Sequence, residues 1–315
     1  MTDVYIAAGA RTPMGAFQGS LSSLTSVDLG TTAIAAAVSR AGLTGADIDE
    51  VIMGCVLAAG LRQGPARQAA IEAGIPVTTG ATTINKLCGS GMKATMLAHD
   101  LIKAGTNKIM VAGGMESMTN APYLLPKARG GFRMGHGEIQ DCMFTDGLED
   151  ARTGHLMGAF AQEMADRYQM TRQDMDNFAI QSLTRAQQAI ADGSLVAETI
   201  AVTVKNRSGE TTVTDDEQPG KANLDKIPTL RPAFSADGTV TAANSSSISD
   251  GASALVLASD DAIKTHQLQP MARIVGHSTN SRDPSEFTIA PVNSEGDRKS
   301  TRLNSSHVAI SYAVF

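Results

Sequence analysis

Between residues 81 and 112, the sequence predicts a strand, a glycine-flanked turn, a helix and a second strand, in that order. Few folds accommodate this order. Residues 81–85 read Ala-Thr-Thr-Ile-Asn, a β-branched composition that predicts a strand. Residues 90–104 place Met92, Met96, Leu97 and Leu101 at helical spacing, and Gly105 follows as a stop. Residues 108–112 predict a second, buried strand. This β-turn-α-β unit predicts an α/β protein.

Cys88 lies in the turn that opens the predicted helix. A helix N-terminus offers unpaired N–H groups and a partial positive charge, both of which favour the nucleophilic thiolate over the thiol. Gly89 and Gly91 carry no side chain, so a substrate carbonyl has room to approach the sulfur, and the same N–H groups are suited to hold an oxyanion. The alternative is a buried structural thiol, because free cysteine is among the most buried residue types. The residues alone favour neither interpretation.

Five segments, in order along the chain, resemble the thiolase family, whose members make or cleave 3-oxoacyl-CoA thioesters. The segment Asn85-Lys86-Leu87-Cys88-Gly89-Ser90-Gly91-Met92-Lys93-Ala94 resembles the nucleophile motif of these enzymes. The other four are Arg11-Thr12-Pro13-Met14-Gly15-Ala16-Phe17, Gly113-Gly114-Met115-Glu116-Ser117-Met118, Leu230-Arg231-Pro232-Ala233-Phe234 and Asp250-Gly251-Ala252. The resemblance extends from the start of the chain to about Pro291.

The resemblance implies a layered αβαβα fold built from two similar halves, of which this chain carries the first. We expect residues 1–262 to form the N-terminal domain, with an inserted loop subdomain at about 120–241 that covers coenzyme A. Residues 271–292 would begin a truncated C-terminal domain. Residues 293–315 resemble no thiolase element, and they are similar to translated non-coding or adapter sequence. The implied assembly is a homodimer or homotetramer that pairs through the N-terminal half.

The mechanism that the resemblance implies is ping-pong acyl transfer through an acyl-thioester on Cys88. The substrate would be an acyl-CoA, acetyl-CoA or acetoacetyl-CoA by preference, with no metal and no other cofactor. By resemblance, the residues that bind this substrate are Met157, Lys226, Ala242 and Ser246. For Ser246, residue type alone favours a turn hydrogen bond to its own backbone.

Three family segments that complete this chemistry are missing from the sequence: Asn-Glu-Ala-Phe, Gly-His-Pro and Cys-x-Gly-Gly-Gly. They supply the base, the oxyanion partner and a second acid/base cysteine. His99 is a poor substitute, because it lies about three helical turns, roughly 16 Å, from Cys88. Leu156 and Gly220 also stand where the family commonly has His and Arg. The chain as it stands is therefore predicted to be inactive or nearly so.

Composition and charge exclude several functions. The net charge of −6 argues against nucleic acid or an anionic membrane surface as partner. Cys55, Cys88 and Cys142 form no C-x-x-C pair, which argues against a zinc site and favours a reducing compartment. The chain shows neither a signal peptide nor an apolar run of about 18 residues, so we expect a cytoplasmic protein without a membrane span.

Other residues yield local expectations. Arg11 is expected to bridge loops rather than bind an anion, and Glu116 to accept loop N–H groups rather than act as acid or base. Cys55 is expected in the core. Ser26 is expected to cap the first helix. A helix beginning at Thr171, with Asp174 in a capping-box position, and ending at 192–193 should pack through one apolar face, made by Met175, Phe178, Ala179 and Leu183. Residues 121–137 are expected to be irregular chain, residues 200–204 and 211–213 to form a hairpin, and Ser259 to cap a short helix.

Three interpretations of function remain open at this point. The first is a thiolase whose sequence is truncated. The second is a 3-oxoacyl synthase of the same superfamily that depends on an acyl-carrier protein, although the match at residues 113–118 argues against it. The third is a non-catalytic interaction subunit or an inert fragment.

Overall fold

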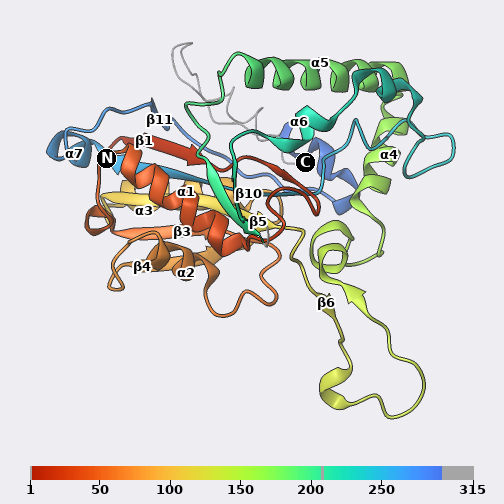
Figure 1. Ribbon diagram of the computed structural model, residues 1–315, viewed down its shortest axis with the longest axis horizontal. Helices are drawn as coiled ribbons and strands as arrows, with labels where there is room; N and C mark the ends of the chain where they lie inside the picture. The colour runs from red at the N-terminus through yellow and green to blue at the C-terminus, as the bar shows by residue number, and fades with distance from the viewer. Residues whose placement is uncertain (1, 207–208, 293–315) are drawn as a thin grey trace.

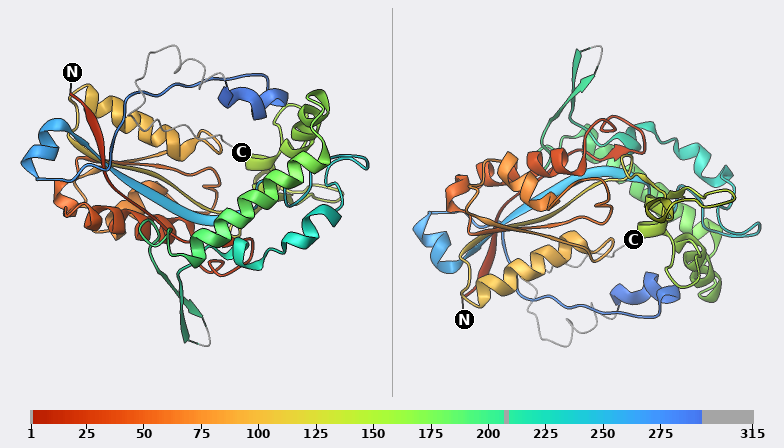
Figure 2. Two further views of the ribbon diagram at one scale, coloured as in Figure 1. Left: turned by 90° about the horizontal axis from the view of Figure 1, so that it is seen from above. Right: turned by 90° about the horizontal axis from the view of Figure 1, so that it is seen from below.

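The computed structural model describes residues 2–206 and 209–292 (Figure 1). Residues 293–315, for which the sequence predicts a tail unrelated to the family, lie outside the described part. Residues 2–118 and 249–273 form an α/β core, and a long inserted region extends from one end of its sheet (Figures 1 and 2).

The core is a seven-stranded mixed sheet with the strand order β11-β1-β10-β5-β3-β4, in which β2 also pairs with β10. The strands are β1 (Val4–Arg11), β2 (Gly15–Ala16), β3 (Glu50–Gly54), β4 (Gly80–Ile84), β5 (Ile109–Ser117), β10 (Ser249–Ser259) and β11 (Ala272–Arg273). Strand β3 is parallel to both β4 and β5, whereas β10 is antiparallel to β5 and β1. The predicted β-turn-α-β unit is thus β4, α3 and β5, and β5 runs five residues further than predicted.

Helices cover both faces of this sheet. Helices α1 (Ser26–Arg40) and α2 (Pro65–Glu72) pack on one face, and α3 (Ser90–Lys103) packs on the other (Figure 2). Successive side chains of a strand point to opposite faces, so Val51 and Met53 join the α1 side while Ile52 joins the α3 side. This alternation produces two apolar layers.

The first helix begins one residue earlier than predicted. Thr25, not Ser26, is its N-cap, and its hydroxyl accepts a hydrogen bond from the backbone N–H of Asp28 at 3.2 Å. The carboxylate of Asp28 accepts the N–H of Thr25 in return, at 2.8 Å, which completes a capping box. Ser26 instead lies buried, where its hydroxyl accepts the backbone N–H of Ser117 at 2.8 Å. The acid three residues after Thr25 was the sequence signal that could have identified Thr25 as the N-cap.

The inserted region alternates irregular chain with short elements and two longer helices. These are β6 (Tyr123–Leu124), η2 (Ala128–Gly130), β7 (Gln140–Asp141), η3 (Phe144–Leu148), α4 (Met157–Arg167), α5 (Arg172–Ala191), β8 (Val202–Asn206), β9 (Gly209–Val213), α6 (Glu217–Lys221) and η4 (Leu224–Thr229). The predicted hairpin at 200–213 is confirmed as the antiparallel pair β8–β9. The irregular excursion predicted at 121–137 is the long projection below the core in Figure 1.

Helix α5 has the predicted capping pair, in which Thr171 accepts the N–H of Asp174 at 3.1 Å. Its apolar face is narrower than predicted. Ala179 is buried, but Phe178 is 74% exposed, because residues 175, 179 and 183 lie on one side of the helix and 178 is turned away from them. The prediction for Phe178 was therefore wrong. A buried Asp176, paired with Arg172 at 2.6 Å, takes a place on the covered side instead.

After the inserted region, the chain returns to the core as β10. The segment that follows β11 passes beside α3, where His277 contacts Asp100. Ser259 caps α7 (Asp260–Thr265) as predicted, and its hydroxyl accepts the N–H of Ala262 at 3.2 Å. The remaining elements are η1 (Gly45–Asp47) and η5 (Pro284–Ile289). Among residues 2–206 and 209–292, no helix combines the length and apolar character needed to cross a bilayer.

Candidate active site

Cys88 lies in a tight turn between β4 and α3, as the sequence predicts. Gly89 is the N-cap of the helix, so the cysteine immediately precedes the cap. The hydroxyl of Ser90 fastens the turn, because it accepts the N–H of Lys86 at 2.8 Å and donates to the carbonyl of Leu87 at 2.5 Å. Leu87 has a φ of +50°, a strained conformation for a residue with a side chain, and it sets the direction of the chain just before the cysteine.

Glycines let the start of α3 approach the sheet closely. A Cβ on Gly54, at the end of β3, would lie 2.5 Å from the Cβ of Ser90. A Cβ on Gly91 would lie 3.4 Å from the backbone nitrogen of Gly114 on β5. The contact at position 91 is an ordinary van der Waals distance, so the close approach requires glycine at 54 rather than at 91. The turn sits beyond the carboxyl ends of β3 and β5, the edge at which open α/β sheets bind ligands.

The side chain of Cys88 is exposed to solvent, whereas Cys55 and Cys142 are buried. This decides between the two interpretations of the sequence: Cys88 is not a structural core thiol. The expected thiolate is not supported, however. Partial desolvation raises the pKa of the Cys88 thiol, the negative charge of Glu116 raises it further, and a backbone hydrogen bond of the cysteine itself only partly offsets this. The sulfur is accessible but needs a base.

Glu116 holds the loop after β3, as predicted. Its carboxylate accepts the backbone N–H groups of Val56 at 2.7 Å and Leu57 at 3.1 Å. Burial raises the pKa of Glu116, against the effect of these hydrogen bonds. The Sγ of Cys55 lies 3.7 Å from the same carboxylate, and burial together with the charge of Glu116 raises the pKa of Cys55 to about 12. Cys55 is therefore an inert core thiol, which confirms its predicted place.

The four residues that resemblance assigns to substrate binding are all in the inserted region or just after it. Met157 is half-buried at the first position of α4, and Lys226, Ala242 and Ser246 are exposed. The turn hydrogen bond considered for Ser246 is not seen: within the described residues, its hydroxyl makes no hydrogen bond, whereas Ser245 donates to the carbonyl of Thr241 at 2.6 Å. Within the described residues, no hydrogen bond joins these four residues to Cys88, so their roles stay predictions.

Polar residues that the sequence did not single out hold the segment before Ser246 in place. The side-chain oxygen of Gln162, on α4, accepts the N–H groups of Thr239 and Val240, both at 2.9 Å. Asn244 accepts the N–H of Thr241 at 2.7 Å and donates to Asp176 of α5 at 3.2 Å. A polar residue inside an amphipathic helix, such as Gln162 or Asp176, was the only sequence signal available for these anchors.

No histidine of the described chain forms a hydrogen bond with Cys88. His99 and His277 share Asp100, His266 lies 3.9 Å from Asp47, and the ring of His155 packs near Phe160.

Known proteins resemble the chain over most of its length. Residues 4–261 match the family described as thiolase, N-terminal domain. An acetyl-CoA acetyltransferase from Schizosaccharomyces pombe is 46% identical over 292 residues, which are 92% of this chain and 74% of that protein. A cytosolic acetyl-CoA acetyltransferase from Gibberella zeae is 46% identical over 290 residues, 91% of this chain and 73% of that protein.

A solved structure gives the same result for the fold. The crystal structure of an Ascaris suum thiolase in complex with coenzyme A matches with a TM-score of 0.89 and 38% identity, over 95% of this chain and 77% of that one. Together with the family match over residues 4–261 and the exposed cysteine at the start of α3, these similarities show that the chain belongs to the thiolase family.

Proposed function

We propose that Cys88 accepts an acetyl group from acetyl-CoA, in the first half-reaction of a thiolase. The observation that carries the proposal is the single exposed thiol of the chain, held at the N-terminus of α3 in a turn fixed by Ser90. In this step the Cys88 thiol gives up its proton, and its sulfur attacks the thioester carbonyl. A new carbon–sulfur bond forms as the carbon–sulfur bond of acetyl-CoA breaks, and coenzyme A leaves as its thiolate and takes up a proton. First-turn N–H groups of α3 are suited to stabilise the oxyanion.

The second half-reaction would join two acetyl groups. A second acetyl-CoA loses a proton from its methyl carbon, and the carbanion attacks the acetyl thioester on Cys88. A carbon–carbon bond forms, acetoacetyl-CoA leaves, and the cysteine thiolate is restored; thiolysis is the reverse. This reaction requires no metal and no redox cofactor.

The substrate-binding surface proposed for coenzyme A comprises Met157, Lys226, Ala242 and Ser246. Its support is the exposed hydroxyl of Ser246 beside a segment held by Gln162 and Asn244, and the exposed side chain of Lys226, whose ammonium is suited to a phosphate. The similarity to a thiolase solved with coenzyme A points the same way. In this proposal, residues 1–262 are the N-terminal domain, 120–241 its inserted subdomain, and 271–292 the start of a second domain.

We further infer a homodimer or homotetramer in the cytoplasm. Strand β4 lies at the edge of the sheet and pairs only with β3 among the described strands, so a second copy has an open edge to extend. Val77 and Leu87, which flank β4, are 65% and 55% exposed. The reduced cysteines and the cytosolic relative support the compartment. Sedimentation equilibrium tests the assembly, and a monomer at all concentrations would contradict it.

The acyl-transfer proposal is tested by the intact mass of the protein after incubation with acetyl-CoA. We expect the mass of one acetyl group, mapped to the peptide that contains Cys88, in the wild type and in the matched control Cys142→Ser. The variant Cys88→Ser should gain none. Acetylation of Cys88→Ser at the same rate would overturn the proposal. Steady-state thiolysis of acetoacetyl-CoA should be absent or nearly so, because the family's base and second cysteine segments do not occur in this sequence.

A further inference from the structure

Two histidines from distant parts of the chain meet at one carboxylate on α3. The Nδ1 of His99 lies 3.0 Å from Oδ1 of Asp100, and the Nε2 of His277 lies 2.8 Å from the same oxygen. The two imidazole rings stand edge to face, with centroids 5.0 Å apart. One potential ligand atom from each of the three residues lies within 4.8 Å of the other two. The acyl-transfer chemistry uses none of these side chains.

The spacing of these atoms approaches that of a tetrahedral metal site. Zinc binds histidine nitrogen and carboxylate oxygen at about 2.0–2.2 Å, so neighbouring ligands of a tetrahedral ion are roughly 3.4 Å apart. The two nitrogen–oxygen distances here, 3.0 and 2.8 Å, are shorter by about half an ångström. Small side-chain rotations open the site, and a water molecule would supply the fourth ligand.

The electrostatic surroundings favour a cation at this point. The cluster lies near the C-terminus of α3, where the helix dipole favours positive charge. Burial lowers the pKa of His99, which keeps a neutral nitrogen lone pair available, and its hydrogen bond to Asp100 only partly opposes this. The pKa of Asp100 is lowered by hydrogen bonds from both histidines, against the effect of burial, so the carboxylate is charged. The positive charge of Lys103 opposes a cation here, since it disfavours a proton on His99.

We propose that His99, Asp100 and His277 bind a divalent transition-metal ion such as Zn²⁺, which fastens the segment after β11 to α3. The site is structural and independent of the proposed acyl transfer. A neutral imidazole carries one proton, and both histidines face the same carboxylate oxygen. Metal binding therefore moves the proton of each ring to its other nitrogen. Residues 99 and 277 are 178 positions apart in the chain and meet only in the folded structure, so this site could not be recognised from the sequence.

The test is calorimetric titration of the full chain with Zn²⁺. All proteins carry Cys88→Ser, so that the exposed thiol cannot act as a ligand. We expect one saturable site, whose affinity falls at least about tenfold in His277→Ala and in Asp100→Asn. The matched control is His266→Ala, which removes another histidine beside a carboxylate and should leave the affinity unchanged. Equal affinity in His277→Ala and the control, or no saturable binding, would overturn the proposal.

A second measurement tests whether metal binding holds the segment after β11 against α3. Hydrogen exchange of residues 274–280 should slow on addition of Zn²⁺ in the Cys88→Ser protein and stay unchanged in the His277→Ala variant of it. Because Cys88 is absent from both proteins, the outcome does not depend on acyl transfer. Exchange that slows equally in both would show that the ion acts elsewhere and would contradict the proposed site.

Discussion

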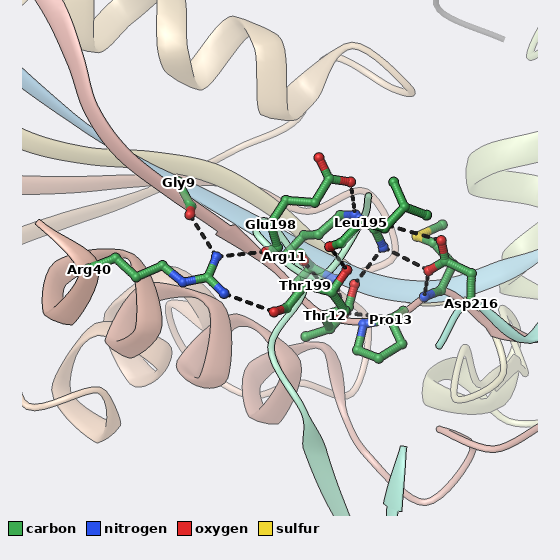
Figure 3. A network of polar contacts seen from close by, with 11 residues as sticks. Gly9, Arg11, Thr12, Pro13, Arg40, Leu195, Glu198, Thr199 and Asp216 are labelled. Carbon is green, nitrogen blue, oxygen red and sulfur yellow. Dashed lines mark hydrogen bonds and ion pairs between the residues drawn. The ribbon is translucent and has the colours of Figure 1, made fainter. Parts of the chain in front are cut away.

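The interactions that stabilise the central sheet differ from those that attach the inserted region to it. The sheet is held by two apolar layers, in which side chains such as Leu29, Ile34 and Val111 are fully buried. The inserted region contributes Val202 and Val204 to one of these layers. It also meets the sheet through charged and polar groups, shown in Figure 3: the guanidinium of Arg11 forms two hydrogen bonds with Asp216, at 2.7 and 3.0 Å, and one with Glu198 at 2.7 Å. This confirms the loop-bridging role predicted for Arg11.

A second arginine extends this junction. Arg40, at the end of α1, donates to the carbonyls of Gly9, Glu198 and Thr199 at 2.8–3.0 Å (Figure 3). Directional bonds of this kind fix the position of a segment, but each adds only about 0.5–3 kcal/mol. The core should therefore determine global stability, whereas the junction should determine how firmly the inserted region is docked.

The largest effect is expected for truncation in the core. Leu29→Ala removes a fully buried side chain of α1 and should lower the free energy of unfolding by about 2–5 kcal/mol, because a cavity remains where the side chain was. Ile71→Ala, on the partly exposed face of α2, is the matched control and should cost less than half as much. Urea denaturation measures both. Equal losses would show that the two apolar layers do not dominate stability.

The core was also the part that the sequence predicted best. Residues 51–54 and 109–112 are short, continuous runs that are typical of buried strands, and both are buried strands in the structure. The turn at Cys88 could be predicted because its glycines and helix start are local features. The raised pKa of Cys88 could not be predicted, because it depends on the desolvation of the sulfur and also on the charge of Glu116, which is 28 positions away and is brought near by the fold.

The next effect in size concerns the junction. Asp216→Ala removes the partner of Arg11 and the acceptor of the Met14 N–H, which leaves a part-buried guanidinium without its main partner. We expect the free energy of unfolding to fall by about 1–3 kcal/mol. The loss should appear mainly as faster limited proteolysis of the 209–221 segment. Glu198→Ala, at an exposed partner of the same arginine, should change proteolysis little. If Glu198→Ala accelerates proteolysis as much as Asp216→Ala does, the burial of the Arg11–Asp216 pair is not what anchors the segment.

Acid should loosen the same junction before it affects the core. Burial of Glu217 favours its protonation, but hydrogen bonds from Lys221, Ser20 and Ala16 outweigh this and lower its pKa from 4.5 to about 2. A carboxyl whose pKa is lowered on folding stabilises the folded state above its unfolded pKa. That stability is lost as the pH falls from about 4.5 towards 2. Proteolysis by pepsin should accelerate over this range, and Glu217→Gln should flatten the dependence.

The smallest effect is expected on α5, where the sequence-based prediction was wrong. Phe178 lies at helical spacing from Met175, which made it a candidate for the apolar face, yet position 178 is turned towards solvent and the covered side also accepts the charged Asp176. Spacing alone could not distinguish these cases, because both Phe178 and Ala179 fit the i+3 and i+4 pattern. Phe178→Ser should therefore change the free energy of unfolding by no more than about 0.5 kcal/mol. A loss of several times that size in urea denaturation, at a protein concentration low enough to exclude association, would mean that Phe178 packs within the chain. In that case, the apolar face of α5 would be as wide as the sequence pattern predicts, and the inserted region would depend on apolar packing as the core does.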